Sequence, residues 1–168
     1  MWGRAKTISL KCGFKVIVDA EDFERLSQFK WYYSKRANNI FRPPGEMMSH
    51  EILQTDKMVD HRDGNISDMR KSNLRKCTPS QNQQNSRKTK RETSSRYKGV
   101  SLFSRDKKWQ VIIGLQDIFG RSYQKNLGLF PTEEKAAEAY DEAARLHFGE
   151  FAALNFPKQG ERSCLYLT

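Results

Sequence analysis

The chain has 168 residues, enough for one average domain or for two small ones with small cores. Lysine and arginine number 30 against 20 acidic residues, so the formal net charge is +10. The mean hydropathy of −0.82 leaves no stretch long enough to span a bilayer, so a membrane protein is excluded and a soluble polyanion is the expected partner.

The first half of the chain alternates apolar and polar residues in the manner of short β-strands. The expected strands are residues 8–10, 14–18, 31–33 and 40–42, with a turn at Cys12-Gly13. Residues 20–29 could form a helix that buries Phe23, Leu26 and Phe29. Pro43-Pro44-Gly45 breaks this pattern, and residues 47–53 are too few to distinguish a helix from a strand by periodicity.

A basic segment without aliphatic residues follows at 86–98. It contains Arg87, Lys88, Lys90, Arg91, Arg96 and Lys98. Such a run indicates an exposed linker, which is either a solvated tether or a segment that also lies along nucleic-acid phosphates.

The last part of the sequence predicts three strands and one helix. The strands are expected at 97–102, 109–114 and 122–129. Thr132 is a suitable N-cap for the helix, and Gly149 can end it. The buried face of the helix is expected to hold Ala136, Tyr140, Ala143, Ala144 and His147.

The residues most typical of a catalytic site lie between 59 and 85. They are Val59-Asp60-His61-Arg62-Asp63-Gly64-Asn65, then Asn73-Leu74-Arg75, then Thr78-Pro79-Ser80-Gln81-Asn82, and Asn85. Phosphodiester hydrolysis needs a base that activates water, and a histidine with a pKa near neutrality suits this role. It also needs positive charge on the phosphate, which a divalent ion can supply, and Asp60 offers that ion an anionic oxygen. Thr78 and Gln81 form a capping box with Pro79 at the first helical position, so Asn82 and Asn85 would share a helix face.

This segment resembles the HNH family of phage and intron homing endonucleases over residues 45–88, and more loosely over the strands before it. The resemblance implies a ββα-metal fold in which His61 lies on the first strand and is the catalytic base. It implies that Asn73 supports catalysis by tying the loop that holds the histidine, and that Asn82 is a metal ligand on the following helix. Asp60 and Asn82 would form an oxygen-only ligand set, which suits one Mg²⁺ or Mn²⁺ better than zinc. His50 is expected to belong to the domain core rather than to the ligands.

A second resemblance covers residues 95–157. It rests on Tyr97-Lys98-Gly99-Val100, Trp109, Leu127-Gly128-Leu129-Phe130, the run from Glu134 to Ala144, and Leu154-Asn155-Phe156. These residues are similar to the AP2/ERF domain of plant ethylene-response factors, in which a three-stranded sheet lies in the DNA major groove and a helix packs behind it.

Alternation predicts which residues of this sheet would face DNA. Trp109, Val111 and Ile113 would face the helix, so Lys108, Gln110, Ile112, Gln124 and Asn126 would face outward. Ser101, Phe103, Ile112 and Gly114 stand near the positions of the plant base-reading arginines, so the plant target should not be carried over. The expected phosphate contacts are Lys98, Arg105, Lys107 and Arg121, together with Arg87, Lys88, Lys90 and Arg91 of the basic segment.

The sequence therefore predicts an α+β protein with an HNH nuclease domain at 1–88, a basic linker at 89–94, an AP2/ERF-type domain at 95–157 and a tail at 158–168. The expected function is metal-dependent, site-directed cleavage of double-stranded DNA by a monomer, with no small-molecule substrate. With three cysteines, no C-x-x-C pair and no signal peptide in residues 1–10, we expect a cytoplasmic protein of a bacterial or phage-infected cell. The alternatives are a non-catalytic DNA-binding regulator with a decayed nuclease module, and a protein that binds structured RNA or acts in recombination.

Overall fold

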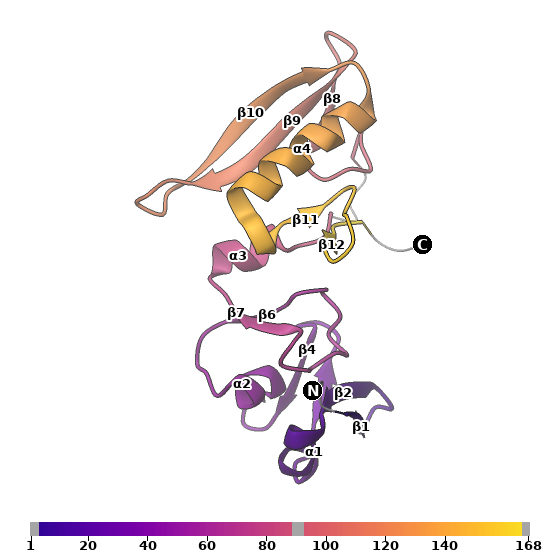
Figure 1. Cartoon of the computed structure of the whole chain (residues 1–168), viewed down its shortest axis with the longest axis vertical. Coiled ribbons are helices and arrows are strands. Elements are labelled where there is room, and N and C mark those ends of the chain that lie inside the picture. The colour runs from indigo at the N-terminus through magenta and orange to yellow at the C-terminus, as the bar shows by residue number, and fades with distance from the viewer. Residues whose placement is uncertain (1–3, 89–92, 166–168) are drawn as a thin grey trace. The chain divides into compact units, whose positions relative to one another are not determined.

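A computed structural model describes residues 4–88 and 93–165. The chain divides into two compact units, Met1–Asn82 and Gln83–Thr168. Within the described residues there are several small sheets and four α-helices, so the protein is of mixed α+β class (Figure 1). None of the helices in the described ranges is long and apolar enough to cross a membrane.

The first unit contains two antiparallel strand pairs and one three-stranded sheet. Its elements are β1 (Ala5–Ser9), β2 (Lys15–Asp19), α1 (Ala20–Ser27), β3 (Tyr32–Ser34), β4 (Asn39–Arg42), β5 (Glu46–Met47), α2 (Met48–Leu53), β6 (Val59–His61), β7 (Leu74–Lys76) and α3 (Pro79–Gln84), which the division between the units crosses. β1 pairs with β2, the order of the sheet is β3-β4-β5, and β6 pairs with β7. The hydrophobic core of this unit includes Val16, Leu26, Trp31, Ile40 and Met48.

Local sequence explains the start of this unit. Gly13 adopts a φ of 80°, and the Leu10 amide donates to the Phe14 carbonyl at 2.8 Å, so the predicted Cys12-Gly13 turn joins β1 to β2. Leu26 is buried as predicted, and Phe23 and Phe29 pack partly against the same core. Residues 48–53, which periodicity left undecided, form α2.

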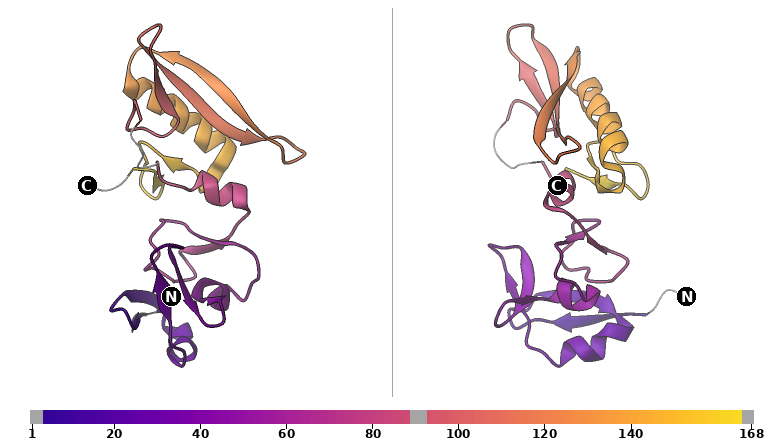
Figure 2. Two further views of the ribbon diagram at one scale, coloured as in Figure 1. Left: turned by 180° about the vertical axis from the view of Figure 1, so that it is seen from behind. Right: turned by 90° about the vertical axis from the view of Figure 1, so that its left-hand side faces the viewer.

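The second unit is a three-stranded antiparallel sheet with a helix on one face, which Figure 2 shows in two views. Its elements are β8 (Val100–Phe103), β9 (Lys108–Gln116), β10 (Ser122–Phe130), α4 (Glu133–Phe148), the 3₁₀ helix η1 (Gly149–Phe151), β11 (Ala153–Leu154) and β12 (Arg162–Ser163). β9 lies between β10 and β8. β12 pairs in parallel with β11, so the segment expected to be a tail contributes a strand, and Cys164 beside it is fully buried.

The predicted ends of α4 are confirmed. The Lys135 amide donates to Thr132 Oγ1 at 3.3 Å, and Gly149 ends the helix with a φ of 53°. The predicted buried face is correct except at its end, where His147 is exposed and Phe148 is buried. The reason is that the row through Tyr140 and Ala144 advances by four residues and therefore reaches 148.

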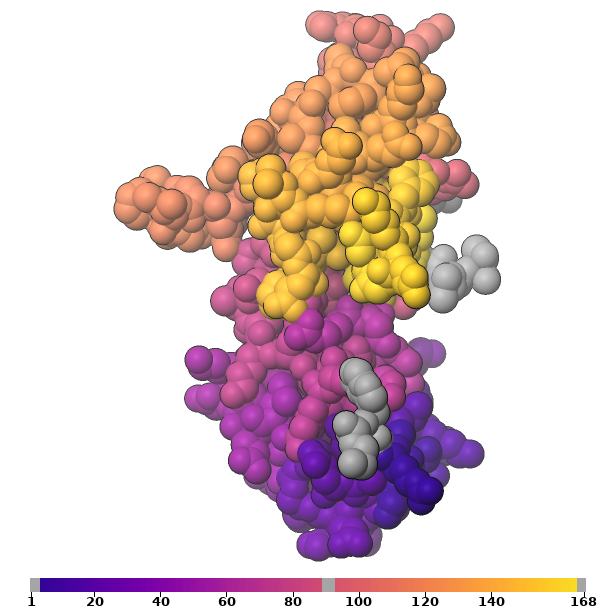
Figure 3. Space-filling view, in the orientation of Figure 1, coloured from indigo at the N-terminus to yellow at the C-terminus, as the bar shows by residue number. Residues whose placement is uncertain are grey.

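β9 and β10 form a hairpin of two nine-residue strands with a bulge. The register pairs Asn126 with Ile112 and Gly128 with Val111, so Leu127 is the extra residue. The Gly128 amide donates to Asn126 Oδ1 at 2.9 Å across this bulge. The turn that joins the strands stands out from the surface of the unit in Figure 3.

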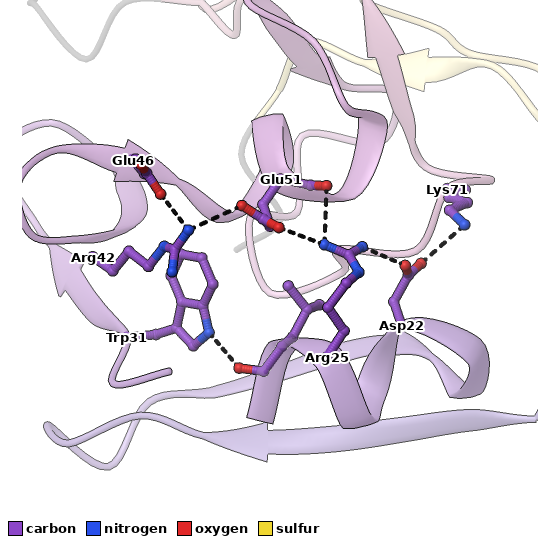
Figure 4. Close-up of polar contacts among 8 residues, drawn as sticks. Asp22, Arg25, Trp31, Arg42, Glu46, Glu51 and Lys71 are labelled. Atoms are coloured by element: carbon purple, nitrogen blue, oxygen red, sulfur yellow. Dashed lines mark hydrogen bonds and ion pairs between the residues drawn. The ribbon is translucent and has the colours of Figure 1, made fainter. Parts of the chain in front are cut away.

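Charged side chains of the first unit form a network between α1, α2 and β4 (Figure 4). Arg25 bonds Asp22 at 2.7 Å and Glu51 at 2.6 Å. Arg42 also bonds Glu51, at 3.2 Å, and its guanidinium lies 3.7 Å from the centroid of the Phe29 ring. These contacts join α1, α2 and β4 beside the core residue Trp31.

Candidate active site and nucleic-acid interface

Asn73 fixes the long loop that joins β6 to β7. Its Oδ1 accepts a hydrogen bond from the Asp63 amide at 3.1 Å, and its Nδ2 donates to the Asp68 carbonyl at 2.9 Å. Its own carbonyl accepts from the Arg62 amide at 2.8 Å. One buried side chain therefore ties the loop on both sides, next to His61.

Asp60 lies opposite Arg75 in the β6–β7 register and forms a buried ion pair with it. Arg75 Nε and Nη2 donate to Asp60 Oδ2 at 2.9 and 2.8 Å, and the two side chains are only 8% and 6% exposed. Sequence reasoning assigned Asp60 to a metal and gave Arg75 no role. The opposite charges at paired strand positions were the available signal, but it could be used only once the register was known.

His61 is the last residue of β6. Burial lowers the pKa of its imidazole below the ordinary value, while the charges of Asp60, Asp63 and Asp68 act in the opposite direction. The neutral form, which can accept a proton, is therefore favoured near neutral pH. Asp68 itself is held by Arg70, whose hydrogen bonds lower the pKa of that carboxyl.

The helix that follows is capped as predicted. The Thr78 amide donates to Gln81 Oε1 at 2.8 Å, and the Gln81 amide donates to Thr78 Oγ1 at 3.2 Å. Asn82 lies in α3 with an exposed side chain. Asn85 lies beyond the last helical residue and is buried, so the two asparagines do not form one exposed helix face.

In the second unit, the strand register defines the face of the sheet that α4 leaves uncovered. Trp109, Val111 and Ile113 pack toward α4, as predicted. Cross-strand partners share a face, so the outward face contains the other set of residues. It holds Ser101, Phe103, Lys108, Gln110, Ile112, Gly114, Gln116, Ser122, Gln124, Asn126 and Leu129.

Amide side chains dominate the middle of this outward face. Gln110, Gln124 and Asn126 are all on it, which is the arrangement that alternation predicted. Asn126 uses its carbonyl oxygen in the bulge, so its amide nitrogen is the better group for contacting a ligand.

The predicted phosphate contacts are placed differently from one another. Arg105 and Lys107 are exposed at the β8–β9 turn, beside Lys108 of the outward face, and Arg121 is exposed at the other end of β9, where it bonds Asp117 at 2.8 Å. Lys98 instead turns inward: its Nζ donates to the carbonyls of Gln84 and Ser86 at 2.8 Å, and burial lowers its pKa to about 8. Lys98 is therefore a structural contact within the second unit.

The basic segment is described only in part. The Lys88 amide donates to the Cys164 carbonyl at 2.8 Å, and burial lowers the pKa of the Lys88 side chain. Arg87 is half-buried. Lys90 and Arg91, and most of the predicted linker, lie outside the described residues.

A curated protein from Acanthamoeba polyphaga mimivirus, named an uncharacterized HNH endonuclease, is 33% identical to this chain over 153 residues. The match covers 85% of this chain and 75% of the viral protein. The chain belongs to the HNH endonuclease family. No family model and no solved structure matches this chain.

Two plant proteins match shorter parts of this HNH family member. A dehydration-responsive element-binding protein of Arabidopsis thaliana is 59% identical over 32 residues, which is 19% of this chain and 10% of the plant protein. An AP2/ERF and B3 domain-containing protein of Oryza sativa subsp. japonica is 47% identical over 66 residues, which is 39% of this chain and 16% of the plant protein. These matches support an AP2/ERF-like DNA-binding part in the chain.

The family raises the question of which residues could hold a divalent ion. The described residues contain no group of three or more His, Cys, Asp and Glu side chains that could hold a metal alone. Magnesium needs no such cage, because one or two protein oxygens with water and phosphate oxygens suffice. The charges of Asp60, Asp63 and Asp68 act on His61, but Asp60 and Asp68 are already paired with Arg75 and Arg70.

Proposed function

We propose that the chain is a metal-dependent DNA endonuclease that hydrolyses phosphodiester bonds and is directed to its sites by the sheet of the second unit. The observation that carries the proposal is the placement of His61. It ends a strand beside a loop tied by Asn73, within a chain of the HNH endonuclease family. The name of the viral relative supports an endonuclease activity.

His61 would act as the general base of the reaction. Its imidazole would accept a proton from the attacking water, and the bonds of Asn73 would keep its loop in place during this step. Asp60 and Asn82 would hold one Mg²⁺ or Mn²⁺. When bound, that ion would supply positive charge to the phosphate and to the departing 3′ oxygen.

The outward face of the second unit would provide site selection. Gln110 and Gln124 carry amides that can pair with the edge of adenine in the major groove, and the amide nitrogen of Asn126 can donate a further hydrogen bond. Arg105, Lys107 and Lys108 would contact phosphates, which position the protein without specifying sequence. The AP2/ERF-like matches support DNA as the partner of this face.

One observation favours a second candidate, a DNA-binding regulator whose nuclease module has lost activity. The guanidinium of Arg75 lies within hydrogen-bond distance of the proposed metal ligand Asp60. A cation at Asp60 must share that carboxylate with a positive charge, which weakens its binding.

Cleavage of supercoiled plasmid separates the two candidates. The purified chain should convert the plasmid to the nicked or linear form with Mg²⁺ or Mn²⁺, and EDTA should prevent this. The regulator would instead retard the plasmid in a gel and leave it supercoiled with either metal. Binding should weaken steeply with salt in both cases, because lysine and arginine displace counterions from DNA.

A further inference from the structure

Two large apolar side chains are exposed next to one another at the end of the β9–β10 hairpin. Ile118 is 92% exposed and Phe119 is 75% exposed. Neither belongs to the hydrophobic core of the unit, so neither contributes burial to its stability. Exposed apolar side chains that adjoin one another, unlike single ones, can form part of a binding surface.

The turn that carries them is held by its own hydrogen bonds. Asp117 Oδ1 accepts from the amides of Phe119 and Arg121 at 2.9 Å. The Asp117 amide donates to the Arg121 carbonyl at 3.0 Å, and the Gly120 amide donates to the Asp117 carbonyl at 2.9 Å. Gly120 has a φ of 78°, which closes the turn without strain. The apolar side chains are thus carried by a backbone turn held in one conformation, so binding need not order the turn itself.

The turn follows directly after a rung whose side chains belong to the outward face of the sheet. Gln116 and Ser122 pair across the last rung before the turn and lie on the same face as Gln124. Arg121 bonds the Asp117 carboxylate, and its guanidinium lies 5.2 Å from the centroid of the Phe119 ring. The charges of the turn therefore balance, so a phosphate backbone is not repelled, and a cation stands directly beside the aromatic ring.

We propose that Ile118 and Phe119 insert between adjacent base pairs of the DNA that the outward face holds. The inference rests on the proposed function, since it requires DNA as the partner. Apolar side chains such as Phe and Ile can open a base step, as they do in proteins that kink DNA from the minor groove, and an inserted ring stacks on a base. Arg121 then lies near the phosphates that flank the opened step.

This insertion adds selectivity that does not depend on hydrogen bonds to base edges. Pyrimidine–purine steps unstack most easily, so a bound site should have such a step beneath the turn. The cost of opening the step falls on the DNA, because the turn is already ordered.

The topology of closed circular plasmid tests the insertion. Plasmid is relaxed by a metal-independent topoisomerase in EDTA, with and without the full chain. Affinity is measured separately on a mixed-sequence duplex of about 40 base pairs, which is almost four helical turns. The test variant is Ile118→Ser with Phe119→Ser. The matched control is Leu146→Ser, because Leu146 is 80% exposed on α4, which covers the opposite face of the sheet.

We expect the wild-type chain and Leu146→Ser to change the linking number of the plasmid. The double variant should lose this change and bind the duplex at least about tenfold more weakly, while Phe119→Trp should retain both properties. Wild-type binding without any change in linking number would overturn the insertion and leave the proposed function standing. A double variant that binds the duplex and changes the linking number as the wild type does would also overturn it. So would a double variant that differs from the wild type only in self-association, measured by sedimentation, because the turn would then be a contact between copies of the chain. Absence of DNA binding by the wild-type chain would refute the proposed function itself.

Discussion

The buried pair of Asp60 and Arg75 makes the first unit sensitive to substitution at a proposed metal ligand. In Asp60→Ala, the Arg75 guanidinium loses its carboxylate partner while its side chain is only 6% exposed. Removing one partner of a buried pair costs about 3–5 kcal/mol. A unit of this size has a free energy of unfolding of about 4–12 kcal/mol, so Asp60→Ala removes a large fraction of it.

The double replacement Asp60→Leu with Arg75→Met provides the contrast. It removes both charges and keeps similar volume, so we expect its stability to lie within about 1–2 kcal/mol of the wild type. If Asp60 also binds the metal, this variant should fold and yet fail to cleave DNA. Loss of activity in Asp60→Ala alone would not separate a lost ligand from a lost fold.

Urea denaturation followed by NMR provides the measurement. The buried indole N–H of Trp31, which donates to the Leu26 carbonyl at 2.8 Å, reports on the first unit. The indole N–H of Trp109, a side chain packed partly buried against the second core, reports on the second unit. Only the Trp31 transition should move in Asp60→Ala. A shift below about 1 kcal/mol, or a double variant no more stable than Asp60→Ala, would refute the reasoning about the pair.

Three further substitutions test other parts of the account. Asn73→Ala removes the side-chain hydrogen bonds to Asp63 and Asp68. It should lower the cleavage rate by at least about tenfold and leave the affinity for DNA nearly unchanged. An equal loss of DNA binding would contradict a role confined to the loop that holds His61. Gly99 has a φ of 77°, and an added Cβ would lie 2.1 Å from Tyr140 Cδ2, so Gly99→Ala should lower the free energy of unfolding of the second unit by about 2–4 kcal/mol in urea. Gly114 has open space around it, so Gly114→Ala should be nearly neutral. Equal effects of the two substitutions would contradict the contact predicted at Tyr140. Hydrogen bonds from Arg145 lower the pKa of Glu161 to about 2, so this pair stabilises the fold above pH 4.5 and its contribution is lost as the pH falls from 4.5 toward 2. Glu161→Gln should therefore cost no more than about 1 kcal/mol at pH 7 and flatten the acid limb of a stability curve; an unchanged acid limb would contradict the assignment.

Local signals in the sequence predicted local structure well. The Cys12-Gly13 turn, the capping box of Thr78 and Gln81, and the cap at Thr132 each depend on residues within a few positions, and each is confirmed. The same holds for the inward set Trp109, Val111 and Ile113, because alternation along one strand fixes its faces.

Long-range contacts could not be predicted in this way. The pairing of Asp60 with Arg75 depends on the register of two strands separated by a loop of twelve residues, 62–73. Lys98 was expected at phosphates because a basic run lies before it, but the fold places carbonyls of Gln84 and Ser86 within its reach. The sequence also did not predict that Ile118 and Phe119 are exposed at a turn. Their exposure becomes visible only once the members of the hydrophobic core are known.

The roles assigned to His61, Asn73, Asp60 and Asn82 remain predictions drawn from the HNH resemblance. The structure adds a physical basis for two of them. It gives Asn73 bonds on both sides of the loop and gives His61 an environment that favours the neutral imidazole. For Asp60 it adds a competing partner that the sequence did not reveal.

The most direct test of the central claim is the single-turnover rate of plasmid cleavage by His61→Ala beside His50→Ala. Both variants remove a histidine of the first unit, and His50 lies in α2, outside the β6–β7 loop. We expect His61→Ala to lower the rate by at least about 100-fold with Mg²⁺ or Mn²⁺, and His50→Ala to cleave nearly as fast as the wild type. Equal rates for the wild type and His61→Ala would contradict the assignment of His61 as the base that activates water.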